Sequence, residues 1–150
     1  MSHYEKAWQG VLHRIDAAVR AASRPPGSVQ LLAVSKTFPA DAVRAVHACG
    51  QRAFGENYVQ EALAKRVALA DLPDVQWHLI GPLQSNKTRE AAQAFDRVES
   101  VDRARIAQRL SAQRPAGMPP LEVLIEVNAS GESSKSGVSP EGVLSLAREI

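Results

Sequence analysis

The sequence predicts an α/β fold of the (β/α)8 TIM-barrel type, with only about the first five β/α units present in the 150 residues. Short apolar runs alternate five times with segments of helical periodicity, which implies parallel strands joined by right-handed crossovers. Polar residues follow several of these runs, and barrels carry function at the carboxyl ends of their strands. We therefore expect residues 1–150 to be the N-terminal portion of one barrel domain, whose last strands lie beyond Ile150.

A small open sheet of five strands is the alternative architecture. A doubly wound sheet that binds dinucleotides carries a glycine-rich GxGxxG turn after one strand, and no such turn follows the predicted strands. A complete barrel usually takes roughly 250 residues, and the chain stops within a helical pattern at residues 145–150. Both features favour part of a longer barrel.

The first two elements are a helix and a buried strand. Trp8, Ile15 and Val19 are spaced as one face of a helix, which the prolines and glycine of residues 23–28 end. Residues 31–35, LLAVS, form a short continuous apolar run, the pattern of a strand that is buried on both faces.

The later elements repeat this order of strand and helix. Pro39 opens a second helix, and Gly50 lies where a helix C-terminal glycine belongs. We expect strands over residues 52–55, 75–80, 97–101 and 121–127, and helices over residues 57–70, 85–95 and 102–113. Ser139 is expected to cap a last helix that carries Val143 and Leu146.

Composition limits the classes of function. Lys plus Arg is 18 and Asp plus Glu is 16, and this near-balance argues against nucleic-acid binding driven by phosphate neutralisation. The single cysteine, Cys49, excludes an intramolecular disulfide and a cysteine metal cluster, and the four histidines lack metal-ligand spacing. With no signal-peptide core and no membrane-length apolar run, we expect a cytoplasmic protein without a membrane or nucleic-acid partner.

Lys36 ends the first predicted strand. On a barrel this lysine points toward the mouth, where apolar neighbours such as Leu32 and Val34 disfavour its charged form. The neutral amine is the nucleophile that forms a Schiff base with an aldehyde, whereas an arginine would stay protonated. The alternative is a lysine whose ammonium extends into solvent, and the isolated feature favours that alternative.

Asn57 and His78 are the other candidates. Asn57 lies where a helix begins, so N-capping is the default interpretation and a ligand contact is the alternative. His78 lies among apolar residues of the third strand, where a lone histidine is usually a hydrogen-bonded core residue. The loop of residues 81–87 lacks the glycine density of a P-loop, and residues 130–137 fit either an anion-binding or a mobile loop.

Five segments within residues 30–138 carry a more specific signal together than any one of them does alone. They are AVSKT, FGENYVQE, WHLIGPLQSNK, SVDR and VNASGESSKSG. In order and spacing they resemble the pyridoxal phosphate homeostasis protein family, which has the fold of the alanine racemase N-terminal barrel. In that family the lysine of the AVSKT motif holds pyridoxal 5'-phosphate (PLP) as an internal aldimine, and the resemblance assigns this role to Lys36.

The resemblance also implies a function. The family acts mainly as a carrier and regulator of the cofactor, without established catalytic turnover, and we therefore expect this protein to buffer the reactive aldehyde and deliver it to apo-enzymes. Asn57 and His78 would contact the pyridine ring, and a monomer is expected. The alternatives are a PLP-dependent amino-acid racemase or lyase on the same barrel, which would need a second acid/base group opposite the lysine, and a cofactor-free Schiff-base aldolase.

The sequence departs from the family pattern in two places. Phe38 stands where many relatives have a second lysine, so any accessory role of that lysine is in doubt here. The phosphate-binding serine and glycine segments of the family follow late strands, so we expect the phosphate grip beyond Ile150. Residues 1–150 alone should then bind the cofactor poorly and expose sheet edges.

Overall fold

The computed structural model describes residues 2–150, which form a five-stranded parallel sheet and six α-helices. The strands are β1 (Ala33–Val34), β2 (Ala53–Glu56), β3 (Gln76–Leu79), β4 (Arg97–Val101) and β5 (Glu122–Ile125). The helices are α1 (His3–Ala21), α2 (Ala40–Ala48), α3 (Val59–Ala68), α4 (Thr88–Ala94), α5 (Ala104–Gln113) and α6 (Val143–Glu149). Two 3-10 turns, η1 (Ser85–Lys87) and η2 (Pro140–Gly142), precede α4 and α6.

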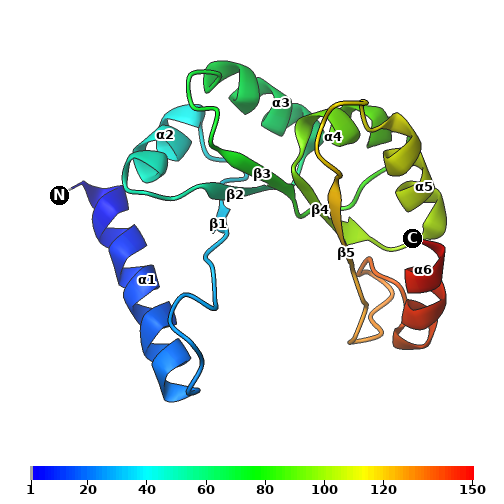
Figure 1. The fold of residues 1–150 in the computed structure, drawn as a ribbon, viewed down its shortest axis with the longest axis horizontal. Coiled ribbons are helices and arrows are strands. Elements are labelled where there is room, and N and C mark those ends of the chain that lie inside the picture. The colour runs from blue at the N-terminus through cyan, green and yellow to red at the C-terminus, as the bar shows by residue number, and fades with distance from the viewer. Residues whose placement is uncertain (1) are drawn as a thin grey trace.

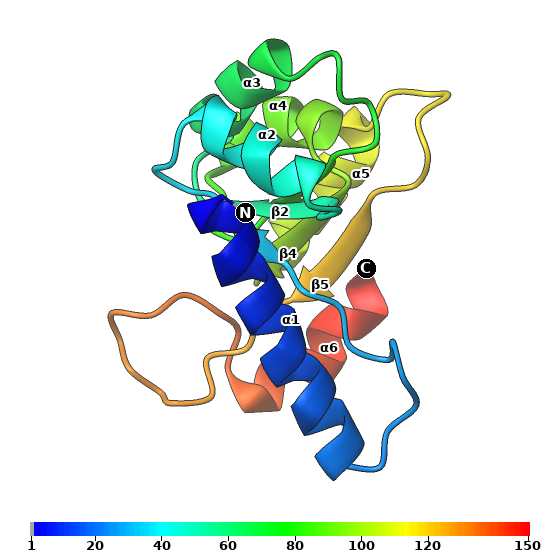
Figure 2. The same cartoon turned by 90° about the vertical axis from the view of Figure 1, so that its left-hand side faces the viewer.

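The strands lie in the sheet in their sequence order, and each neighbouring pair is parallel. A doubly wound sheet reverses direction at a switch point, whereas right-handed crossovers in one direction put every connecting helix on the same face. Figure 1 shows the curved sheet with α2 to α5 along its outer side, and Figures 1 and 2 show α1 and α6 apart from this layer. The topology is that of part of a β/α barrel, as the sequence predicted.

The hydrophobic core lies between the sheet and the outer helices. Phe54 of β2 is 1% exposed and Leu79 of β3 is fully buried, and they pack with Ile106 and Leu110 of α5 in one cluster. On the inner face Val34 is 50% exposed, because residues 2–150 do not cover that face. The sheet is therefore closed on its helical side and open on the side that faces a barrel interior.

Most predicted elements are present, with shifted bounds. β4 covers the predicted residues 97–101, and Gly50 follows α2 with φ +113, the left-handed value expected of a C-terminal glycine. Ser139 accepts a hydrogen bond from the Gly142 amide but caps the turn η2 rather than α6 itself. The predicted strand at residues 31–35 was too long: β1 covers only Ala33–Val34, which pair with Phe54 and Gly55 of β2.

Candidate functional site

Lys36 lies in a tight turn directly after β1. The amide of Phe38 donates to the carbonyl oxygen of Ser35 at 3.1 Å, which closes a four-residue turn with Lys36 and Thr37 at its centre. Thr37 has φ +67, a left-handed value that a β-branched residue rarely adopts and that costs about 1–3 kcal/mol. The Lys36 side chain is exposed, so residues 2–150 do not form the apolar enclosure that the sequence led us to expect.

Strand register brings Lys36 and Asn57 to one level of the sheet. Val34 pairs with Gly55, and each of the two candidates follows two residues later. Gly55 pairs in turn with His78, so His78 lies one level deeper along the strands than Lys36. The structure thus brings Lys36 and Asn57 to adjacent strand ends, as predicted, and leaves His78 nearer the middle of β3.

Asn57 does not cap α3, and the default interpretation from the sequence was wrong. Tyr58 is the N-cap residue of α3, and its side chain makes no capping hydrogen bond. The Asn57 side chain instead lies against Gly81, where an added Cβ would come within 2.6 Å of the Asn57 Oδ1 and 2.3 Å of its carbonyl oxygen. Only glycine permits this approach, which fixes the loop after β3 beside the end of β2.

His78 is a buried, hydrogen-bonded histidine. Its side chain is 9% exposed, and its Nδ1 lies 2.7 Å from Oε1 of Glu99 on the neighbouring strand β4. This agrees with the default interpretation of a lone histidine in a core strand. Its contact with a pyridine ring stays a prediction.

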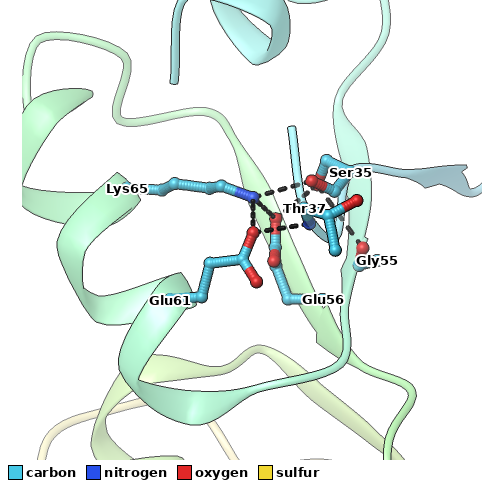
Figure 3. Close-up of polar contacts among 6 residues, drawn as sticks. All are labelled: Ser35, Thr37, Gly55, Glu56, Glu61 and Lys65. Atoms are coloured by element: carbon cyan, nitrogen blue, oxygen red, sulfur yellow. Dashed lines mark hydrogen bonds and ion pairs between the residues drawn. The ribbon is translucent and has the colours of Figure 1, made fainter. Parts of the chain in front are cut away.

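A buried ionic network lies behind the Lys36 turn (Figure 3). Lys65 of α3 donates to Oε1 of Glu56 at 2.6 Å, to Oε1 of Glu61 at 2.8 Å and to the carbonyl oxygen of Ser35 at 2.7 Å. Glu56 is fully buried and Lys65 is 5% exposed. The hydroxyl of Ser35 also donates to Oε1 of Glu56, at 2.6 Å.

The sequence analysis missed these three charged residues. Glu61 and Lys65 are four positions apart, a spacing that predicts an ion pair on one face of a helix. Such pairs are usually exposed to solvent, and the burial of Lys65 is seen only in the structure. The hydrogen bond from Lys65, assisted by one from the Thr37 amide, lowers the pKa of the Glu61 carboxyl below its usual value. Glu61 is therefore held in its charged form beside the turn.

The carboxyl ends of β4 and β5 carry two carboxylates and a long loop. Burial, with the nearby charge of Asp102 as the second cause, raises the pKa of Glu126 above its usual value. Asn128 organises the loop: its Oδ1 accepts from the Gly131 amide at 3.0 Å, and its Nδ2 donates to the Glu132 carbonyl at 2.9 Å. The Gly137 amide donates to Asp102 at 3.3 Å and draws the end of the loop back to β4.

Residues 2–150 contain neither a candidate metal site nor a candidate membrane span. No cluster of histidine, cysteine or acidic side chains there is suited to holding a metal ion. None of the helices in this range is long and apolar enough to span a bilayer.

Fold and site together define a parallel β/α barrel protein with a lysine at the end of its first strand. The sequence profile of the alanine racemase N-terminal domain matches residues 9–150, and the chain belongs to that family. It is 61% identical over 140 residues to the pyridoxal phosphate homeostasis protein of Pseudomonas aeruginosa, covering 93% of this chain and 60% of that one. The resemblance found in the sequence is thereby confirmed.

Solved structures agree on the fold. A protein of Bifidobacterium adolescentis, 37% identical, superposes with a TM-score of 0.89 over 97% of this chain and 63% of that one. PipY of Synechococcus elongatus, in a structure with PLP bound, is 41% identical with a TM-score of 0.71, covering 89% of this chain and 63% of that one. The chain spans about 60% of the length of the curated relatives that it matches.

Proposed function

We propose that residues 1–150 are the lysine-bearing, N-terminal portion of a single-domain cytoplasmic barrel that binds PLP and acts in its homeostasis. Lys36 holds the cofactor as a Schiff base, so that the protein buffers the reactive aldehyde and delivers it to apo-enzymes. Catalytic turnover is not part of this function. The observation that carries the proposal is the exposed Lys36 on a fixed turn at the end of β1, in a chain 61% identical to a pyridoxal phosphate homeostasis protein.

The residues present fit the aldehyde-bearing part of the cofactor. Lys36, whose side chain is exposed, and Asn57 each follow the paired residues Val34 and Gly55 by two positions, and Gly81 lets the loop after β3 approach Asn57 closely. The likeness to PipY, whose structure was solved with PLP bound, supports the same cofactor here. Asn57 is the nearer ring contact in this proposal and His78 the deeper one. The phosphate grip is assigned to sequence beyond Ile150.

The chemistry of attachment is simple condensation. The neutral amine of Lys36 attacks the aldehyde carbon, a C=N bond forms and one water leaves. The cofactor, when bound, supplies the electron sink, and the chain supplies attachment and orientation. Because condensation is reversible, release by water regenerates the free lysine and the free aldehyde, which is what a carrier requires.

Borohydride reduction followed by peptide mass mapping tests the attachment. In the full-length protein incubated with PLP, we expect a pyridoxyl adduct on Lys36 that is lost in Lys36→Ala and retained in the control Lys87→Ala, which removes a half-buried lysine of η1 that pairs with Glu90. Residues 1–150 alone should label weakly. An unlabelled Lys36 in the full-length protein would overturn the assignment.

Two assays separate a carrier from a racemase or lyase. A carrier transfers PLP to an apo-enzyme and exchanges the α-proton of amino acids with deuterium negligibly. A racemase or lyase exchanges that proton at a measurable rate, which Lys36→Ala abolishes. Exchange of this kind in the full-length protein would replace the carrier by the enzyme.

A further inference from the structure

The turn that bears Lys36 is held by side chains of α3 from the outer side of the sheet (Figure 3). Lys65 donates to the carbonyl oxygen of Ser35 at 2.7 Å, and the amide of Thr37 donates to Oε1 of Glu61 at 2.6 Å. Ser35 and Thr37 are the residues directly before and after Lys36. Glu61 and Lys65 of α3 therefore hold the backbone on both sides of Lys36 through hydrogen bonds.

We propose that Glu61 and Lys65 are positioning residues, which fix the backbone of this turn and thereby place the Lys36 amine for condensation with the cofactor aldehyde. This inference rests on the proposed function, because it concerns the same lysine. It assigns a role to side chains that lie behind the sheet.

Burial makes these hydrogen bonds between α3 and the Lys36 turn difficult to break. The three N–H donors of the Lys65 ammonium are used by Ser35, Glu56 and Glu61, so the charge is saturated where it is only 5% exposed. A buried charge that loses a partner is strongly destabilised. A shift of α3 relative to β1 would break this arrangement, so the helix and the turn hold one another in register.

The hydrogen bonds between α3 and the turn also explain how the turn keeps an unfavourable backbone. Thr37 has φ +67, and such values persist only where the surroundings over-determine them. The Thr37 amide points at the Glu61 carboxylate in this conformation and would lose that acceptor in another. Without Glu61 the turn is free to relax, and a displacement of the lysine of about 1 Å is enough to slow a positioned reaction.

The decisive variant is Glu61→Ala in the full-length protein. Its side chain is 27% exposed, and its removal leaves Lys65 paired with the buried carboxylate of Glu56, so we expect a smaller loss of stability than removal of Glu56 would cause and retention of the fold. We expect borohydride-trapped adduct on Lys36 to form about tenfold more slowly, the effect of losing one charge-assisted hydrogen bond. Glu61→Gln keeps an oxygen that accepts from the Thr37 amide and should restore most of the rate.

Glu90→Ala is the matched control. Glu90 is also a helical glutamate that accepts a hydrogen bond from a neighbouring helix, here from Gln60 of α3 at 2.8 Å, but it lies on α4. Its removal should leave the trapping rate unchanged. A loss in Glu90→Ala equal to that in Glu61→Ala would show a general effect of surface charge and would overturn the inference.

Two readouts need no cofactor. In Glu61→Ala we expect the Thr37 amide to exchange with deuterium faster, and acetic anhydride to acetylate Lys36 at a rate altered severalfold relative to Lys87 in the same sample. Faster exchange with unchanged acetylation and unchanged trapping would make the contact merely structural and would overturn the inference.

The same readouts separate this inference from the proposed function. If the wild-type protein takes no PLP adduct on Lys36, the proposed function fails. The acetylation ratio then decides by itself whether Glu61 positions the lysine. If the adduct forms equally fast in wild type and Glu61→Ala, the proposed function stands and the positioning role is wrong.

Discussion

The carboxyl ends of β1 and β2 carry a cation-bearing turn that a buried ionic network holds from behind, whereas the carboxyl ends of β4 and β5 carry two carboxylates and a long exposed loop. Lys65 and Glu56 of the first region are nearly or fully buried. In the second region the side chains that hold the loop, Asn128 and Asp102, are only half-buried. Both regions lie at the same edge of one parallel sheet.

The contrast shows which of the two regions is held rigidly. A saturated buried charge is costly to disturb, so the first region is fixed in one geometry, which is what the proposed attachment of a cofactor to Lys36 requires. The hydrogen bonds of the Asn128 side chain hold a loop that is exposed to solvent, so local unfolding of the second region should need less free energy than local unfolding of the first. We therefore expect substitutions to be costly in the first region and mild, or even stabilising, in the second.

Lys65→Met should have the largest effect. It leaves the Glu56 carboxylate buried without its cation, and breaking such a pair costs about 3–5 kcal/mol. Among the described residues Oε2 of Glu56 has no hydrogen-bond partner to compensate for the missing cation. The double variant Glu56→Gln/Lys65→Met removes both charges, so it should recover most of the lost free energy of unfolding. Denaturant unfolding of the full-length protein measures both variants.

Arg44→Met is the control for that experiment. Arg44 pairs with Asp71 at 2.6 Å, but the two side chains are 42% and 61% exposed, and ion pairs in contact with water contribute less than buried ones. Its unfolding midpoint should stay close to that of the wild type. An equal loss in Arg44→Met and Lys65→Met would remove the distinction between the two kinds of ion pair.

Gly81→Ala should have the next largest effect. The added Cβ would lie 2.3 Å from the Asn57 carbonyl oxygen, and backbone on both sides has to move, which costs about 1–3 kcal/mol. Gly10→Ala is the matched control, because that glycine lies within α1 with no atom within 4 Å of the new Cβ. It should stabilise the protein slightly through helix propensity. Thermal unfolding that ranks the two variants in the opposite order would contradict the close approach.

Sequence reasoning succeeded where a local pattern decides the outcome. The alternation of strands and helices predicted the parallel sheet, and the polar residues after the apolar runs predicted that Lys36 and Asn57 follow the ends of strands. Gly50 ended α2 as its position indicated. In each of these cases the signal lies within a few residues of its structural consequence.

The sequence-based predictions failed where the position of a side chain depends on residues that are distant in sequence. Asn57 had the residue type and place of an N-cap, but Gly81, twenty-four positions later, provides the surface against which it lies. Lys65 had the pattern of a solvated helix pair, and its burial depends on Ser35, thirty positions earlier. A single sequence holds no signal for either contact.

Asn128→Ala tests the second region with a smaller expected effect. It removes the acceptor of the Gly131 amide and the donor to the Glu132 carbonyl. We expect about 1 kcal/mol or less of global destabilisation and a severalfold faster cleavage of the loop in limited proteolysis. Ser133→Ala, a change at an exposed position of the same loop, is the control and should leave the cleavage rate unchanged. Unchanged cleavage in Asn128→Ala would mean that the loop is held by other contacts.

Glu126→Gln should have the smallest effect and the opposite sign. Because burial and the Asp102 charge raise the pKa of Glu126 above its usual 4.5, the folded state binds this proton more tightly than the unfolded state does. Below pH 4.5 the Glu126 carboxyl is protonated in both states, so burial does not lower the free energy of unfolding. As the pH rises through the raised pKa, the wild type loses free energy of unfolding that the glutamine variant keeps. We expect Tm to rise by about 2 °C or less at neutral pH, since Glu126 is partly exposed, and the gain to vanish in acid. Glu132→Gln, at an exposed position of the loop, is the control. A gain that persists unchanged below pH 4 would show that relief of a buried charge is not its cause.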